Sequence, residues 1–331
     1  MNTRTLLHMT APSREDFDIP YHDFGPQVEA PRVALVAGLH GDELNGVFVL
    51  SRLASFLRRI ADGGRPGVEL RGRVLVIPAV NVLGVNVRTR HFPFDGTDVN
   101  RMFPGYAGGE TTQRIAAALL ALTLTARWRI DIHSSNADFE ELPQVRLYQP
   151  SDEERQAARW LGLPAIVERP ESATYQATLV SAWRTQGGRG LAIQAGHAGS
   201  LQPGHCERLF RALLDFLEAE GVLYGVRLAE SEEAVHHFGP RQAYPVISEH
   251  AGWFVSRLKV GHWLRAGDRV GYIYDGFSGE QRAEAKTPVA GLLSGIRRQP
   301  LLCEGDLLAR ILTPHELVGE VAETYLMGHG Q

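Results

Sequence analysis

A chain of 331 residues is long enough for two domains, and its 44% hydrophobic and 22% charged residues are typical of a globular protein. This composition excludes a disordered, collagen-like or coiled-coil chain, and the sequence contains no uncharged apolar run of the roughly 18 residues that a membrane span needs. The net charge of −4 and the lack of any dense Lys/Arg block argue against a nucleic-acid partner.

Apolar runs that alternate with amphipathic segments predict an α/β fold between residues 31 and 221. The residues before it are expected to add an edge strand or a lead-in. The predicted strands cover 32–38, 73–78, 129–133, 145–148, 164–168 and 190–195, the predicted helices cover 43–60, 111–124, 152–161 and 204–220, and a polar loop covers 84–110. Strands that alternate with helices predict a mostly parallel sheet covered on both faces.

The pattern changes after residue 221. Short β-like runs separated by glycines replace the helical segments there. We therefore expect an α/β domain over residues 1–223 and a smaller all-β domain over residues 224–331.

The sharpest local motif is Gly38-Leu39-His40-Gly41-Asp42-Glu43, where a predicted buried strand ends and a helix begins. Open α/β sheets bind their ligands at this edge. His40 and Glu43 lie three residues apart across the turn and can reach one divalent ion, and zinc suits an imidazole and a carboxylate. By itself an H-x-x-E pair is more often a turn histidine beside a helix-start glutamate.

His133 is a third candidate ligand, because it also ends a strand-like run. Two histidines and one glutamate with an open fourth position are the usual arrangement of a hydrolytic zinc centre. A histidine in this place alone would more often be a buried structural residue, but the three residues together favour a metal site.

The long loop between these ligands carries further candidates. Asn100 and Arg101 offer an amide and a guanidinium fork suited to a substrate carboxylate. Arg88 or Arg90 can polarise a scissile carbonyl and stabilise the developing oxyanion. Any one of these arginines, taken alone, would more often be a solvated surface residue.

In this order, H-x-x-E, D-x-N-R-x-F-P-G and D-x-H-S resemble the motifs of the succinylglutamate desuccinylase/aspartoacylase family, a branch of the zinc carboxypeptidase superfamily. The resemblance covers about residues 31–220. It implies a zinc-carboxypeptidase-like sheet, mixed but mostly parallel, that is covered by helices. The glycine-rich C-terminal part resembles the tail domain of that family and also barrel-sandwich modules.

The resemblance implies specific roles for the candidate residues. His40, Glu43 and His133 match the ligands of one zinc ion per chain, and Asn100 with Arg101 matches the family's carboxylate clamp.

The arginine that polarises the carbonyl in the family is best matched by Arg90, because an arginine followed by a ring residue recurs there. Arg88 stays an alternative, since the loop is longer in this chain. Arg184 is a further candidate for substrate contact.

One residue departs from the family pattern. The family places a glutamate general base on a late strand, where this chain has Gln194. A neutral amide cannot take a proton from the attacking water, although it can orient that water by a hydrogen bond. Glu168 and His197 are candidate substitutes, and each is more simply read as an ordinary surface or turn residue.

The sequence therefore predicts a zinc-dependent amidohydrolase that removes an acyl group from an N-acyl amino acid or a similar small amide. Two alternatives stay open, which are a carboxypeptidase acting on short peptides and a zinc-binding protein that has lost catalysis. With two cysteines and no apolar leader, the chain is expected to be cytoplasmic. We expect no nucleic-acid or membrane partner. The oligomeric state stays open between a monomer and a homo-oligomer.

Overall fold

The structure is a computed structural model that describes residues 3–10, 15–173, 175–226 and 234–314. The α/β part contains β1 (Thr3–Met9), β2 (Phe17–Phe24), β3 (Val33–Ala37), α1 (Leu44–Ala61), β4 (Glu69–Leu70), β5 (Val74–Ile77), α2 (Val82–Val87), the 3₁₀ turn η1 (Val99–Arg101), α3 (Thr111–Thr123), β6 (Trp128–Ser135), β7 (Phe139–Tyr148), α4 (Asp152–Trp160), β8 (Ala165–Arg169), α5 (Leu179–Thr185), β9 (Arg189–His197) and α6 (Pro203–Ala219). The rest contains β10 (Leu223–Tyr224), β11 (His236–Phe238), β12 (Ala243–Ile247), β13 (Gly252–Val255), β14 (Trp263–Leu264), β15 (Arg269–Tyr274), β16 (Gln281–Lys286), β17 (Gly291–Arg297), β18 (Leu301–Leu302) and β19 (Leu307–Leu312).

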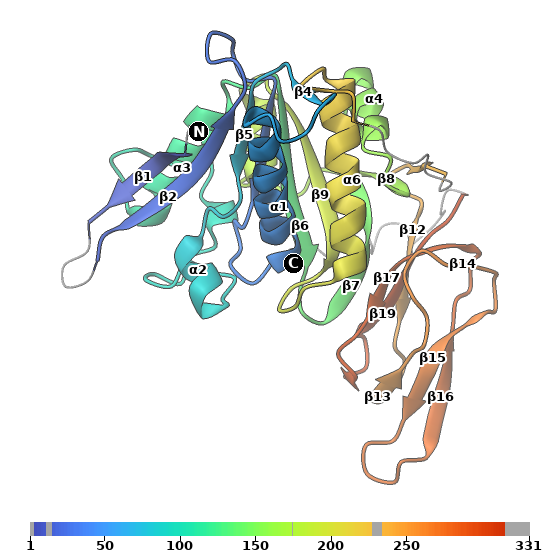
Figure 1. The fold of residues 1–331 in the computed structure, drawn as a ribbon. Helices are drawn as coiled ribbons and strands as arrows, with labels where there is room; N and C mark the ends of the chain where they lie inside the picture. The colour runs from blue at the N-terminus through green and yellow to red at the C-terminus, as the bar shows by residue number, and fades with distance from the viewer. Residues whose placement is uncertain (1–2, 11–14, 174, 227–233, 315–331) are drawn as a thin grey trace.

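The central sheet is mixed, with strand order β1-β2-β5-β3-β6-β9-β7 and β8 beside β7 (Figure 1). Strands β5, β3, β6 and β9 run parallel, and β7 is antiparallel to β9. At the other end, β1 and β2 form an antiparallel edge, as expected of the N-terminal residues. The predicted mixed, mostly parallel sheet is confirmed.

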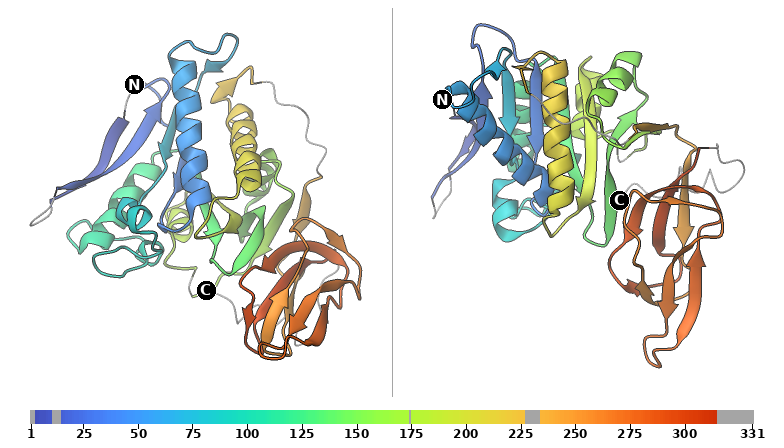
Figure 2. Two further views of the ribbon diagram at one scale, coloured as in Figure 1. Left: turned by 60° about the horizontal axis from the view of Figure 1, so that its bottom comes forward. Right: turned by 45° about the vertical axis from the view of Figure 1, so that its right-hand side comes forward.

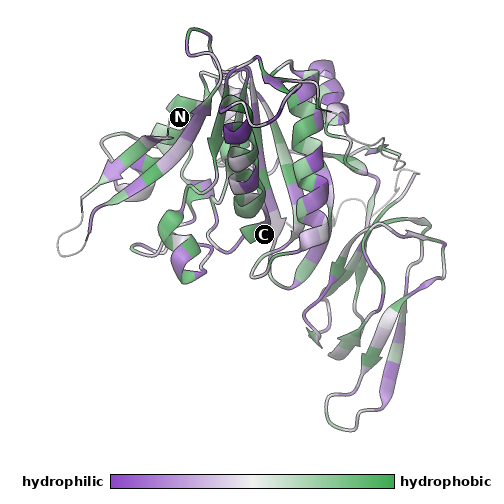
Figure 3. Ribbon diagram, in the orientation of Figure 1, coloured by the Kyte–Doolittle hydropathy of each residue, from purple (hydrophilic) through white to green (hydrophobic). Residues whose placement is uncertain are grey.

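Helices cover both faces of this sheet. Apolar side chains of α1, α4 and α6 pack on one face, and those of α3 and α5 pack on the other. The central strands β3 and β5 are buried throughout, because two-sided cover requires apolar residues at every position. In Figure 3, hydrophobic and hydrophilic residues alternate around α6, as expected of an amphipathic helix with one buried side.

The C-terminal module, which we define as residues 243–314, is an all-β unit, as predicted (Figure 2). Strands β16, β15, β13 and β18 form an antiparallel sheet. Strands β12, β19 and β17 continue the central sheet, because the end of β17 pairs with β7 over 139–141. The two strands closest to residue 224 contact the α/β part instead, since β10 pairs with β4 and β11 with β8.

Most predicted elements of the α/β part occur within a few residues of their expected bounds, but β7 begins six residues before the expected 145–148, and two further differences occur. The segment 84–110 was expected to be a loop, but it begins within α2 and contains η1. The short helix α5 was not predicted, because its apolar residues are buried all round and show no helical alternation. Within the described part of the chain, no helix is long and apolar enough to cross a membrane.

Candidate active site

The H-x-x-E motif forms the tight turn between β3 and α1. Gly38 has φ +64°, in the left-handed region that favours glycine. At Gly41, a Cβ atom would lie 2.1 Å from the carbonyl carbon of Gly84, so this turn contacts the first turns of α2 directly. Glu43 is the N-cap residue of α1, yet its side chain does not cap the helix. Its carboxylate is therefore available to other partners.

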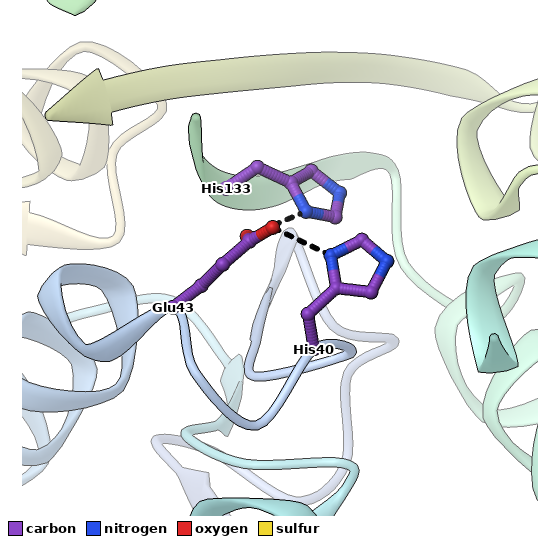
Figure 4. A group of neighbouring side chains, drawn as sticks. All are labelled: His40, Glu43 and His133. Atoms are coloured by element: carbon purple, nitrogen blue, oxygen red, sulfur yellow. Dashed lines mark hydrogen bonds and ion pairs between the residues drawn. The ribbon is translucent and has the colours of Figure 1, made fainter. Parts of the chain in front are cut away.

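His40, Glu43 and His133 converge at the carboxyl ends of β3 and β6 (Figure 4). The Nδ1 atom of His40 lies 2.6 Å from Glu43 Oε1, and the Nδ1 atom of His133 lies 3.0 Å from Glu43 Oε2. One candidate ligand atom from each residue lies within 4.8 Å of the others. The two strand ends therefore meet as the motif spacing predicts, and we call these three residues the His–Glu–His group.

Two aspartates hold the far nitrogens of the imidazoles. His40 Nε2 lies 3.0 Å from Asp98 Oδ1, and His133 Nε2 lies 2.8 Å from Asp131 Oδ2. Metal-binding histidines almost always make such a hydrogen bond, which fixes the ring and its tautomer so that the other nitrogen faces the metal. The donor set of two nitrogens and a carboxylate, supported in this way, fits a zinc ion.

The electrostatics of this site favour positive charge. Burial alone would lower the pKa of His133, but the charges of Asp131 and Glu43 raise it to about 10. Burial likewise opposes a raised pKa at His40, and Glu43 and Asp98 outweigh it. Burial also favours protonation of Glu43, but the two histidines lower its pKa well below the ordinary value. The same carboxylates that stabilise imidazolium ions would stabilise a bound cation.

The loop motif D-x-N-R lies against this group. Asn100 Oδ1 accepts a hydrogen bond from the backbone N–H of Leu179, which orients the amide so that Nδ2 lies 3.4 Å from His133 Nε2. Arg101 donates to the backbone carbonyl of Asn100 and stays partly exposed. Arg90 forms an ion pair with Asp98 at 3.0 Å and lies 3.5 Å from Glu43 Oε1.

The two remaining arginine candidates lie elsewhere. Arg88 ends α2 with φ +57°, and its exposed side chain has no hydrogen bond or ion pair among the described residues. Arg184 of α5 donates to the backbone carbonyls of Tyr148 and Gln149, which follow β7. Neither side chain contacts the His–Glu–His group within the described residues, and their roles toward a substrate stay predictions.

Gln194 lies on β9, the strand next to the one that carries His133. It is the register partner of His133 on β6, and parallel partners place their side chains on the same sheet face. The two substitute bases are held by other groups. Glu168 pairs with Arg155 of α4, on the opposite face of the sheet, and His197 contacts Gln202 and a backbone carbonyl.

Residues 29–219 match the sequence profile of the succinylglutamate desuccinylase/aspartoacylase catalytic domain, which is more than half of the chain. The chain belongs to this family. An N-alpha-acetyl-L-2,4-diaminobutyric acid deacetylase of Halomonas elongata is 27% identical over 298 residues, which cover 88% of this chain and 84% of that protein.

Solved structures of similar proteins share the fold over nearly the whole chain. A succinylglutamate desuccinylase/aspartoacylase of Rhodobacter sphaeroides superposes with a TM-score of 0.76 at 26% identity and covers 95% of this chain and 96% of its own. The product-bound ectoine utilization protein EutE (DoeB) of Ruegeria pomeroyi has a TM-score of 0.75 at 23% identity, with 93% of each chain covered. The C-terminal module is therefore part of the shared fold.

Three further residues surround this desuccinylase/aspartoacylase-type site and were not among the candidates predicted from the sequence. Asp98 and Asp131 are the partners of the imidazoles, and both stand inside the motifs D-x-N-R and D-x-H-S. The D-x-H spacing was a usable signal, because residues two apart on a strand share a face. Arg146 of β7, which contacts Gln194, carries no motif that could have identified it.

Proposed function

We propose that this member of the family is a zinc-dependent deacylase that releases an acyl group from a small N-acyl amino acid. The family relationship establishes the hydrolysis of amide bonds as the reaction class. The observation that carries the metal assignment is the convergence of His40, Glu43 and His133, with both Nδ1 atoms facing one carboxylate and both Nε2 atoms held by aspartates.

The residues of the site have distinct roles in this proposal. A zinc ion held by the His–Glu–His group supplies Lewis acidity toward water and toward the amide carbonyl. Arg90, at the edge of the group, donates hydrogen bonds to the oxygen that gains negative charge as the carbonyl carbon becomes tetrahedral. Asn100 and the partly exposed guanidinium of Arg101 bind the substrate carboxylate and so place the amide bond.

The relatives indicate which substrates to test first. The similarity to the Halomonas elongata deacetylase supports an N-acetylated diamino acid, and the family's desuccinylases support an N-succinyl amino acid. Both have a free carboxylate beside the scissile amide, and this is the group that a clamp of Asn100 and Arg101 would recognise.

The test is the turnover of metal-loaded protein on a panel of N-acetyl and N-succinyl amino acids, with dipeptides as the carboxypeptidase comparison. We expect hydrolysis of one N-acyl amino acid and about one zinc ion per chain by elemental analysis. His133→Ala is expected to lose most of the metal and the activity, because two ligands do not hold zinc at this geometry. Faster turnover of dipeptides, or full metal content in His133→Ala, would contradict the proposal.

A second candidate function is zinc binding without turnover, and Gln194 is the observation that favours it. The amide at this place cannot act as a general base, which typically contributes about 10²–10⁴-fold to the rate. Stoichiometric zinc with no hydrolysis of any compound in the panel would support this candidate instead.

A further inference from the structure

Gln194 is held by a buried charge cluster on the neighbouring strand β7. Its Oε1 atom accepts a hydrogen bond of 3.3 Å from Nη1 of Arg146. The other terminal nitrogen of Arg146 donates to both carboxylate oxygens of Glu141, at 2.7 and 2.6 Å. The Glu141 side chain is 1% exposed and that of Arg146 is 18% exposed. Arg146 is therefore fixed between a buried carboxylate and the amide.

This contact decides which end of the Gln194 amide is available to a substrate. A guanidinium group has only hydrogen-bond donors, so the atom of Gln194 that faces Arg146 must be the oxygen. The amide nitrogen has no hydrogen-bond partner among the described residues, and it is not sealed from solvent. The group that Gln194 leaves unpaired among the described residues is therefore its N–H donor, whereas the glutamate of the family pattern would have an acceptor.

The charge cluster is completed by an arginine from the C-terminal module. Arg310 of β19 forms an ion pair with Glu141, although the two residues are 169 positions apart. Gly295 of β17 is the register partner of both residues, so the three positions lie in one row across β19, β17 and β7. The guanidinium of Arg310 lies over the ring of Phe139, and a Cβ atom at position 295 would collide with that ring. The missing side chain of Gly295 leaves the room that this contact needs.

We propose that Arg310 is a positioning residue of the active site, which acts through Glu141 and Arg146 to hold Gln194 as a hydrogen-bond donor to the substrate carbonyl. The proposal rests on the proposed function, because the amide acts on a substrate bound at the His–Glu–His group. It assigns a role in catalysis to the C-terminal module, which contributes a side chain without approaching the metal ligands. The amide N–H groups stabilise the oxygen that becomes negative, and no proton is transferred to or from Gln194.

The test is a double-mutant cycle with Arg310→Met and Gln194→Ala. Losing one oxyanion donor typically costs about 10²–10³-fold in kcat. We expect Arg310→Met, which misplaces the donor without removing it, to lower kcat about tenfold at unchanged KM and unchanged zinc content. In the Gln194→Ala background the same substitution should lower kcat less than about twofold, because coupled residues are not additive. Equal losses in both backgrounds would overturn the proposal.

Matched variants separate positioning from a general loss of structure. Arg310→Lys retains the positive charge next to Glu141 and should recover most of the kcat. Arg298→Met removes the other arginine of the C-terminal module that pairs with β7, at Glu140, and should leave kcat unchanged. If Arg310→Met does not fold, Arg146→Lys replaces it in the same cycle. The single ammonium group of a lysine cannot contact Glu141 and Gln194 at the same time, as the two terminal nitrogens of Arg146 do.

A crystal structure of Arg310→Met gives a readout that does not depend on turnover. We expect the contact between Arg146 and Gln194 to be lost or the amide to be rotated relative to the wild type. An unchanged Gln194 would overturn the proposal even with a kinetic effect. Wild-type protein that hydrolyses no N-acyl amino acid would defeat the proposed function, while the crystal structure would still decide whether Arg310 positions Gln194.

Discussion

Among single residues, Glu43 determines the geometry of the candidate site. One of its carboxylate oxygens contacts His40, and the other contacts His133 and accepts a hydrogen bond from the backbone N–H of Ser134. An N-cap side chain usually accepts hydrogen bonds from the first turn of its own helix, but Glu43 does not. The start of α1 thus has no side-chain cap, and the Glu43 carboxylate instead contacts both histidines.

Asp131 provides the residue-level prediction. Because it fixes the ring of His133 through Nε2, Asp131→Asn should weaken zinc binding about 10–100-fold, as is typical for residues that support a metal ligand. Competition with a chelator of known affinity measures the effect. The control is Asp62→Asn at the exposed C-terminal end of α1, which should bind zinc like the wild type. Equal zinc affinity in both variants would remove Asp131 from the site.

Among the elements, two turns place the ligands. The turn between β3 and α1 contacts the beginning of α2, whose N-cap Asn81 accepts a hydrogen bond from the backbone N–H of Gly84. At Gly41 the backbone of α2 leaves no room for a side chain, and at Gly84 the side chain of Asn81 fills the space that a Cβ atom would need. Backbone packing between the two turns therefore holds His40 at the sheet edge.

Gly41→Ala tests this packing. The added Cβ atom would lie 2.1 Å from the backbone of Gly84, so one turn must move. We expect a loss of about 1–3 kcal/mol in the free energy of unfolding, as for other overpacked sites, together with weaker zinc binding. Gly204→Ala, in the first turn of α6 with open space around it, should be neutral or stabilise by up to about 1 kcal/mol. Similar stabilities of the two variants in urea would refute the packing argument.

At the scale of the whole molecule, β7 joins the α/β part to the C-terminal module. Its first residues pair with β17, while its later residues pair with β8 and β9. Two consecutive glutamates hold arginines of the C-terminal module, since Glu140 binds Arg298 and Glu141 binds Arg310. One strand thus carries both the glutamates that bind the C-terminal module and the arginine that contacts Gln194.

The ion pair between Glu140 and Arg298 predicts that the stability of the protein depends on pH. Burial opposes ionisation of Glu140, but His205 and Arg298 outweigh it and lower its pKa to about 2. A carboxyl group with a lowered pKa in the folded state stabilises the protein above its unfolded-state pKa of about 4.5 and loses this contribution as the pH falls toward 2.

Glu140→Gln should therefore lower the free energy of unfolding by about 1–2 kcal/mol at pH 7, after allowance for solvent screening, and by less at pH 3.5. Urea unfolding at both pH values measures the difference. Glu153→Gln removes an exposed ion pair with Arg189 and should change stability by less than about 0.5 kcal/mol. A difference between wild type and Glu140→Gln that does not shrink at low pH would contradict the role of this pair.

The sequence by itself determined the kinds of most elements and the edge at which the site forms. Whether a segment is a strand or a helix depends on the spacing of its apolar residues, which is local. His40 follows β3 by three residues, and His133 lies near the end of β6. Since parallel strands end at the same edge of a sheet, two strand-end histidines and a nearby glutamate were enough to predict their convergence.

Only the tertiary structure decided which partners those residues have. His40 and Asp98 are 58 positions apart, and Glu141 and Arg310 are 169 apart. Such contacts depend on strand order and register, which apolar spacing does not encode. The orientation of Gln194 follows from Arg146 on an adjacent strand, and the position of Arg146 follows from a carboxylate that the C-terminal module also binds. Local sequence specifies elements, whereas the packing of distant elements determines which side chains meet.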